Sequence, residues 1–173
     1  MLFSLLADIC DKIEVTSKRL EMTDYLVELF KKTPREIVDK VVYLIQGKLY
    51  PDYMGVEVGI AEKMALRVME KATGLDRKVL EESFKGTGDL GTTTQTLMQD
   101  KVQATLFHQP LTVENVYETL DRIAKAAGSG SSDVKINLLV GLLNNASPNE
   151  AKYIIRMATG ELRLGVADMT ILD

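Results

Sequence analysis

The chain has 173 residues, of which 46% are hydrophobic and 27% are charged, a mixture typical of a soluble globular domain rather than of a disordered segment. The formal net charge of −4 argues against a protein that coats nucleic acid by bulk charge. No apolar run approaches the roughly 20 residues of a membrane-spanning helix. The single cysteine, Cys10, cannot form an internal disulfide, which indicates a reducing compartment, and we expect a cytoplasmic protein.

The first half of the chain shows apolar residues at helical spacing. Helices are predicted over residues 2–13 and 20–30. Between them, the stretch "TSKR" places Ser17 as a helix cap, with Lys18 and Arg19 pointing outward. The stretch "TPRE" (33–36) predicts a third helix that ends at Gly47, because Thr33 can cap it and Pro34 suits the first helical position. A loop, "KLYPDYMG" (48–55), follows.

Further helices are predicted over residues 57–73 and 76–85, closed by Gly74 and Gly86. The glycine-rich stretch 85–96 is interpreted as a break and residues 103–112 as a connector. Three helices are then predicted. The first covers residues 113–127, the second follows the Gly/Ser loop 128–133, and the third runs from "SPNE" (147–150) to Thr159. No alternating strand of useful length occurs. The prediction is an all-α, compact multi-helix domain with short loops. Because "SPNE" repeats the pattern of "TPRE", two similar helical halves are expected.

Catalytic patterns are nearly absent from the sequence. The single histidine, His108, has no cysteine or second histidine with which to share a metal, and HExxH, GxSxG and P-loop motifs do not occur. The stretch "GTGDLG" superficially resembles a dinucleotide-binding motif, but no strand precedes it. We therefore expect no catalytic residue and no metal ligand in this chain, which binds rather than transforms its partner.

Residues 120–165 carry six basic and four acidic side chains, so a local basic face on an acidic body is one possibility. Within this region, "GSGSSDVKI" (128–136) leads flexible residues into a helix start, where free N–H groups and Lys135 suit an anion. The alternative is an ordinary Ser-capped helix after a flexible turn.

The stretch "TGELRLG" (159–165) is the second candidate for anion binding. Gly160 can adopt the left-handed conformation that ends a helix, Gly165 allows a ligand to approach the backbone, and Arg163 offers a fork of donors to a phosphate. The alternative is a corner between two helices with a surface arginine. The third candidate, "TSKRLEM" (16–22), on its own is typical of a solvated helix start.

Together, "SKRLEMTDYLVELF", "KGTGDLG", "GSGSSDVKINLLVGLL" and "SPNEAKYIIRMATGELRLGVAD" resemble the N-terminal DNA-binding domain of ATP-dependent DNA ligases of the archaeal replicative type, which are similar to the eukaryotic ones. The resemblance covers essentially the whole chain. It implies an all-helical domain that grips a nicked duplex from the minor-groove side, mainly through phosphates and without sequence preference.

The resemblance also implies which residues bind DNA. Arg163 and the backbones of Gly160 and Gly165 would hold phosphates. A second phosphate clamp would be formed by Ser129, Gly130, Ser131, Ser132 and Lys135. A third would be formed by Ser17 and Arg19. The chain departs from the family pattern at Glu161, where a basic residue is common in eukaryotic relatives, and at Val134, where a second lysine is frequent.

The family implies a longer protein in which residues 1–173 form the DNA-binding part. The adenylated lysine of the KxDG motif is absent from this sequence, so ATP and Mg²⁺ belong to the full-length enzyme and no cofactor is expected in this fragment. The expected partners are nicked double-stranded DNA and the adenylation domain of the same chain, with no membrane.

An alternative function is docking on the sliding clamp (PCNA). The stretch "QATLF" (103–107), through Gln103, Leu106 and Phe107, resembles the short clamp-binding box of archaeal ligases. The other interpretation is that Leu106 and Phe107 fill the core beneath a loop.

Overall fold

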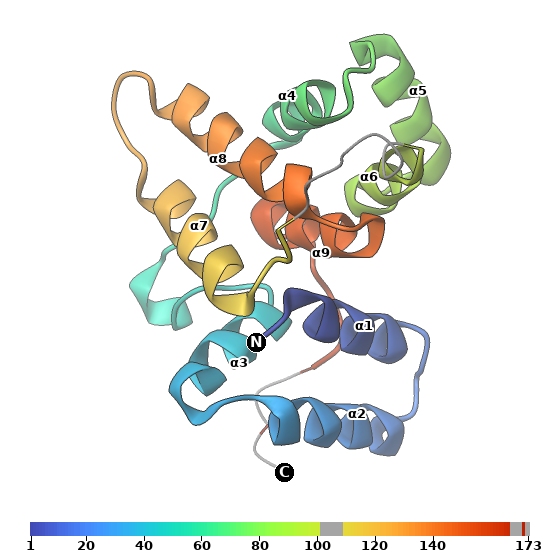
Figure 1. Cartoon of the computed structure of the whole chain (residues 1–173), viewed down its shortest axis with the longest axis vertical. Helices are drawn as coiled ribbons and strands as arrows, with labels where there is room; N and C mark the ends of the chain where they lie inside the picture. Colours follow the sequence, from blue (N-terminus) through green and yellow to red (C-terminus); the bar gives the residue numbers. More distant parts are fainter. Residues whose placement is uncertain (101–108, 167–170, 172–173) are drawn as a thin grey trace.

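Helices make up the regular secondary structure of the chain (Figure 1). The computed structural model describes residues 1–100, 109–166 and 171. The all-α prediction is confirmed: within these residues there is no strand, only one isolated β-bridge between Leu2 and Thr112. The elements are α1 (Phe3–Glu14), α2 (Arg19–Lys32), η1 (Arg35–Ile37), α3 (Val38–Ile45), η2 (Asp52–Met54), α4 (Glu62–Thr73), α5 (Arg77–Thr87), α6 (Leu90–Gln99), α7 (Val113–Lys125), α8 (Ser131–Asn145) and α9 (Pro148–Thr159).

Helix α9 lies at the centre of the molecule (Figure 1) and packs against α6, α1, α4 and α8. A helix that is apolar on most of its sides must be covered on most of its sides. Seven of the residues of α9 are buried: Glu150, Ala151, Tyr153, Ile154, Ile155, Met157 and Ala158. Because α9 is held from several directions, the segment that follows it leaves from a rigid base.

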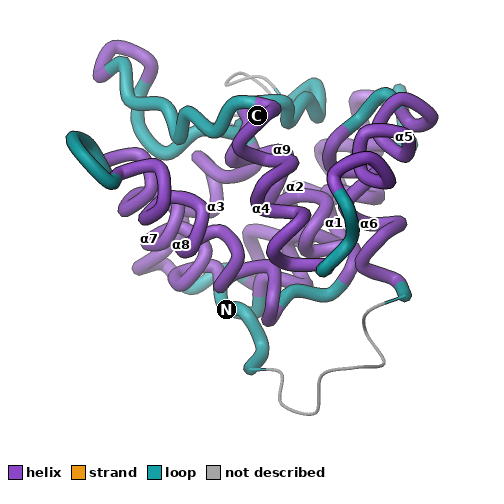
Figure 2. Tube along the Cα trace, turned by 90° about the horizontal axis from the view of Figure 1, so that it is seen from above, coloured by secondary structure: helices purple, strands orange, loops and turns teal. Residues whose placement is uncertain are grey.

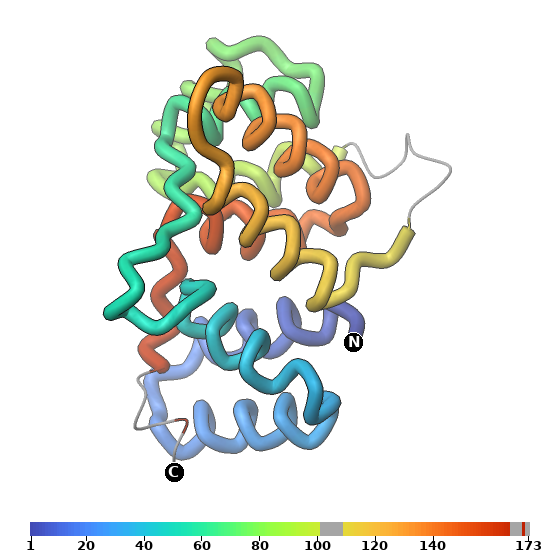
Figure 3. Tube along the Cα trace, turned by 90° about the vertical axis from the view of Figure 1, so that its left-hand side faces the viewer, coloured from blue at the N-terminus to red at the C-terminus, as the bar shows by residue number. Residues whose placement is uncertain are grey.

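The other helices pack against one another around α9. Helices α1 and α2 pack together at one end, and α7 packs against α8. Seen from above, the helices fill the body of the molecule and the loops lie toward its rim (Figure 2). Figure 3 shows that residues 46–61 and 160–166, far apart in sequence, run along the same side. Within the part of the chain that the structure describes, no helix is long and apolar enough to span a bilayer.

The predicted helix over residues 57–73 is wrong at its start, because α4 begins only at Glu62. Residues 55–61 are outside any helix, and their burial alternates: Val58 and Ile60 are buried, whereas the residues between and beside them are exposed. Gly59 has φ +72°, which interrupts a helix. The Ile60 N–H donates to the Ala158 carbonyl at 3.2 Å, so this segment is joined to α9.

The predicted break over residues 85–96 is also wrong. Gly86 lies inside α5, and Gly88, with φ +70°, ends that helix instead. Helix α6 then starts at once, because the Asp89 carboxylate accepts the Thr92 N–H at 2.7 Å. The threonines that suggested a loop sit within α6, and three of them, Thr93, Thr94 and Thr96, donate their hydroxyls to carbonyls four residues earlier.

The two similar start signals behave differently. "SPNE" forms the predicted capping box between Ser147 and Glu150, and Thr112 caps α7 as predicted. "TPRE" does not: Thr33 donates its hydroxyl to the Leu29 carbonyl, and the 3-10 turn η1 precedes α3 without a side-chain cap. The pattern that suggested two similar halves therefore has no common structure.

Candidate nucleic-acid interface

The segment after α9 combines a fixed path with an exposed face. Helix α9 ends at Gly160, which has φ +72° and whose N–H donates back to the Arg156 and Met157 carbonyls. Beyond it, Leu162 and Leu164 are buried, whereas Glu161, Arg163 and Gly165 are exposed. The alternation anchors one face of the segment in the core and presents the other face to solvent.

Arg163 lies on the exposed face of this segment. Its Nη1 donates to the Gly160 and Leu162 carbonyls, both at 2.9 Å. Among residues 1–100, 109–166 and 171, no carboxylate lies within ion-pair distance of its guanidinium. The two backbone bonds fix the direction of the side chain, and Nε and Nη2 are left to face a ligand.

Gly160 and Gly165 contribute differently to this segment. The Gly160 N–H is used by the end of α9 and its carbonyl by Arg163, so this residue shapes the turn. Gly165 has φ +69°, is exposed, and has no atom within 4 Å of the position that a Cβ would occupy. Its backbone is therefore open to close approach by a phosphate.

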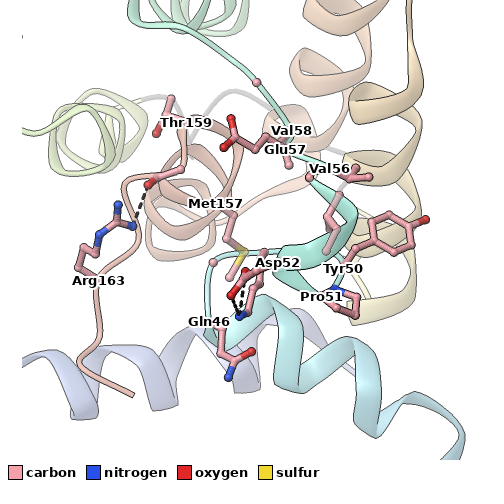
Figure 4. A pocket seen from close by; sticks show the side chains of 16 residues that line it. Gln46, Tyr50, Pro51, Asp52, Val56, Glu57, Val58, Met157, Thr159 and Arg163 are labelled. Carbon is pink, nitrogen blue, oxygen red and sulfur yellow. Dashed lines mark hydrogen bonds and ion pairs between the residues drawn. The ribbon is translucent and has the colours of Figure 1, made fainter. Parts of the chain in front are cut away.

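An open cavity of about 540 Å³ lies beside Arg163. Figure 4 shows Arg163 and Thr159 on one side of it and Tyr50 and Pro51 on the other. In its floor, Lys48 is paired with Asp52 at 3.2 Å, and Gly47 is packed against Leu162, whose Cβ would lie 3.1 Å from an added Cβ. The cavity is thus lined both by residues 46–59 and by the end of α9 with Arg163.

The second candidate stretch forms the start of α8. Gly130, with φ +79°, is the N-cap residue and brings no side chain to cap the helix, so Ser131 and Ser132 begin an uncapped first turn. Ser129 and Ser132 are exposed, and Lys135 is half-buried. Such a start attracts an anion. Asp133 in the same turn opposes it.

The third candidate stretch connects α1 and α2. The predicted Ser17 cap is wrong, because Lys18 is the N-cap residue of α2 and no side chain caps it. The Thr16 hydroxyl accepts the Lys18 N–H at 3.2 Å, and Lys18 pairs with Glu21 at 2.9 Å. Ser17 and Arg19 are exposed.

These three stretches come from separate corners of the molecule. In Figure 1 the α7–α8 connection lies at the upper left, the α1–α2 connection at the lower right, and residues 160–166 descend between them from α9. The six basic residues of 120–165 do not converge, because Lys152 and Arg156 are each only 12% exposed and form ion pairs inside the domain. Lys125 is paired with Asp121.

Sequence reasoning missed the ion-pair network that uses Arg156. Its guanidinium bridges Glu14 of α1, at 2.7 Å, and Asp89, at 2.8 Å. Despite partial burial, which acts to raise it, the pKa of each carboxyl group is lowered, because the hydrogen bonds from Arg156 and its neighbours outweigh burial. The stretch "GDLG" therefore has an internal role, and the spacing from Asp89 to Thr92 was its sequence signal for a helix cap.

Glu161 is the acidic residue directly before the arginine segment. Its N–H donates to the Arg156 carbonyl at 2.9 Å, which completes the end of α9. Partial burial raises the pKa of its carboxyl group, and the negative charges of Asp89 and Glu62 raise it further. The positive charges of Arg156 and Arg163 act to lower this pKa but do not outweigh burial and the two carboxylates.

The clamp-box residues, Gln103, Leu106 and Phe107, lie outside the described residues, as does His108. Their role stays a prediction.

The chain is similar to known proteins over its whole length. The family model described as "DNA ligase N terminus" matches residues 2–173. The chain is 51% identical over 173 residues to a DNA ligase of Nitrosopumilus maritimus, 53% identical over 178 residues to DNA ligase 2 of Thermofilum pendens, and 44% identical over 182 residues to a DNA ligase of Acidianus ambivalens. These alignments cover 99–100% of this chain but only 29–30% of the length of those relatives.

Proposed function

Because this chain belongs to the family of DNA ligase N-terminal regions, we propose that it binds nicked duplex DNA through phosphates and positions the nick for strand joining by a longer, ATP-dependent ligase. Contacts to phosphates carry no base information, so the binding is independent of sequence. The catalytic steps belong to the remainder of such an enzyme, and this domain contributes by holding the two strand ends in place.

The single observation that carries the proposal is the exposure and hydrogen bonding of the Arg163 side chain. An exposed guanidinium that is aimed by two backbone carbonyls, with no carboxylate partner among the described residues, is suited to bind a phosphate with two parallel hydrogen bonds. Its segment is anchored by Leu162 and Leu164. The side chain therefore loses little conformational freedom on binding.

The separation of the three candidate stretches is compatible with a single duplex. DNA presents one phosphate about every 3.4 Å along each strand, so a protein can hold it at several distant points. The uncapped start of α8 would receive one phosphate by its N–H groups, and the 160–165 segment another. A few local donors at separate points, rather than the net charge, would then allow a chain with a net charge of −4 to bind a polyanion.

We propose that the nucleotide chemistry belongs to the remaining domains of the longer enzyme. No KxDG lysine occurs in the sequence, and among the described residues no three His, Cys, Asp or Glu side chains form a group that could hold a metal ion. ATP and Mg²⁺ would act in the remaining domains of the longer enzyme.

The substitution Arg163→Ala tests the proposal. We expect the dissociation constant for a nicked duplex to rise about 3- to 10-fold at low salt, because one charge-assisted contact is lost. The slope of log K against log salt concentration should fall by about 1. Fluorescence anisotropy with two nicked duplexes of unrelated sequence measures both quantities, and the loss should be equal for the two.

Arg35→Ala is the matched control. Arg35 is also exposed, but η1, which carries it, lies at the opposite edge of the molecule from residues 160–166 in Figure 3. Its replacement should leave the salt slope unchanged. If Arg163→Ala bound nicked duplex as the unmodified chain does, the phosphate role would be refuted.

A further inference from the structure

One guanidinium connects three parts of the fold. Arg156, in the last turn of α9, donates from Nη1 to Glu14 at the end of α1 and from Nη2 and Nε to Asp89 at the start of α6. The Asp89 carboxylate also caps α6 through Thr92. The ends of α1 and α9 and the start of α6 therefore meet at a single side chain.

The main chain of the same residue holds the arginine segment. The Arg156 carbonyl accepts the N–H groups of Gly160 and Glu161, and the Gly160 carbonyl in turn accepts Nη1 of Arg163. Hydrogen bonds, together with the covalent chain of Arg156 and Gly160, thus link the Asp89 and Glu14 carboxylates to the guanidinium of Arg163.

Close packing leaves Arg156 little freedom. A Cβ added at Gly91 of α6 would lie 2.7 Å from the Arg156 Cγ and 2.8 Å from its Nε. The side chain is 12% exposed, and it lies 5.7 Å from the centroid of the Tyr153 ring. An arginine with several partners in a confined space is held in one conformation. A shift of one of its partners would therefore move Arg156 and, with it, the end of α9.

The network around Arg156 contains two cations, Lys152 and Arg156, and three carboxylates, those of Asp11, Glu14 and Asp89. Lys152 pairs with Glu14 at 2.8 Å and with Asp11 at 3.4 Å, and the Tyr153 hydroxyl donates to the same two carboxylates. Among the described residues, Asp89 has only one basic partner, which is Arg156. Removal of the Asp89 charge therefore acts on Arg156 more directly than on the other members.

We propose that Arg156, held by Asp89 and Glu14, is a positioning residue for Arg163, which keeps the 160–165 segment in the geometry that binds phosphate. The inference rests on the proposed function of Arg163. Arg156 itself does not touch DNA. The same contact sets the end of α1, three residues before the exposed Ser17, so one ion-pair network orients two of the three candidate phosphate sites.

A double-mutant cycle tests this proposal with Arg156→Met, Arg163→Ala and the combined variant, by anisotropy on nicked duplex. We expect Arg156→Met to weaken binding by nearly as much as Arg163→Ala, and the combined variant to be no more than about twofold weaker than Arg163→Ala alone, because coupled residues are not additive. Full additivity, or unchanged binding in Arg156→Met, would overturn the proposal.

Asp89→Asn provides a second variant with an opposite electrostatic expectation. Asparagine keeps the helix cap, so α6 should form, while the pairing with Arg156 is weakened. Loss of a negative charge should by itself strengthen binding to a polyanion. The positioning role predicts the reverse, a fall of about twofold or more with a reduced salt slope. Stronger binding by Asp89→Asn would contradict the proposal even if Arg156→Met failed to fold.

The outcomes separate this inference from the proposed function. If Arg163→Ala has no effect, the phosphate role itself is wrong. If Arg163→Ala weakens binding but Asp89→Asn and Arg156→Met do not, only the positioning role is wrong. Thermal unfolding followed by circular dichroism, with binding measured well below each midpoint, shows that every variant is folded during the assay.

Discussion

Glu161 places a negative charge beside the residue that we expect to bind phosphate. Its main-chain N–H closes the end of α9, and any residue except proline could supply that donor. Its carboxyl group, by contrast, lies near Asp89 and Glu62 and has a raised pKa, chiefly through partial burial. The side chain therefore opposes DNA binding without contributing to the turn.

We expect Glu161→Gln to bind nicked duplex roughly 1.5- to 5-fold more tightly, the scale of a single partly exposed charge. In the unmodified chain, binding should also strengthen as the pH falls through the raised pKa of Glu161, because protonation removes the charge. The variant should lack this increase. Anisotropy titrations from pH 7.5 down to pH 4.5, the ordinary pKa of a glutamate carboxyl group, measure the difference, and parallel pH profiles for the two proteins would count against it.

At the scale of elements, the contact between α6 and α9 depends on a glycine, Gly91, which has no side chain to hold the helices apart. Gly91 faces α9 where the Lys152 carbonyl lies 2.8 Å, and the Arg156 Cγ 2.7 Å, from the place of a Cβ. Backbone cannot move aside as a flexible side chain can. The glycine therefore sets the distance between the two helices and, with it, the geometry of the Arg156 network.

Gly91→Ala should lower the free energy of unfolding by about 1–3 kcal/mol, the usual cost of overpacking. Gly86→Ala is the matched control: Gly86 lies in helix α5 with no atom within 4 Å of the Cβ position. It should be neutral or stabilising by up to about 1 kcal/mol. Urea denaturation monitored by circular dichroism compares them, and equal midpoints would show that α6 and α9 can separate at no cost.

The starts of α7 and α9 could be predicted from the sequence because their caps act locally. Thr112 and Ser147 meet their N–H partners within three residues. One error arose where a distant contact decides: Val58 and Ile60 are buried, and the Ile60 N–H donates to α9 instead of continuing a helix. The error over residues 85–96 had a local cause, because the Asp89 carboxylate caps α6 through Thr92 and the glycines masked that signal.

At the scale of the whole molecule, the sequence could identify candidate phosphate sites but not their surroundings. Arg163 and its two glycines stand within seven residues, so their shared role could be inferred. The ion pairs that bury Lys152 and Arg156 could not be inferred, because their carboxylate partners lie more than 60 residues away in the sequence. Burial of those two cations removes them from the outer surface and leaves stability, as well as binding, dependent on their ion pairs.

This dependence predicts acid sensitivity of the domain. The pKa values of Glu14 and Asp89 are lowered in the folded state, so the folded state binds fewer protons than the unfolded state. Their contribution to stability is complete above the unfolded pKa values, near pH 4, and is lost as the pH falls through the lower folded values. Glu161, with a raised pKa, acts in the opposite direction and gains stability as it protonates.

Urea midpoints between pH 7 and pH 3 should therefore decline steeply below about pH 4 in the unmodified chain. Arg156→Met should be less stable at pH 7, because it leaves Asp89 without its cation, yet its midpoint should fall less on acidification, since the affected carboxyl groups no longer gain from being charged. The exposed pairs, such as Glu28 with Lys32, are the same in both proteins, so the difference between the curves isolates the network. Curves that stay parallel across this range would mean that Arg156 does not hold the carboxylates in their charged form.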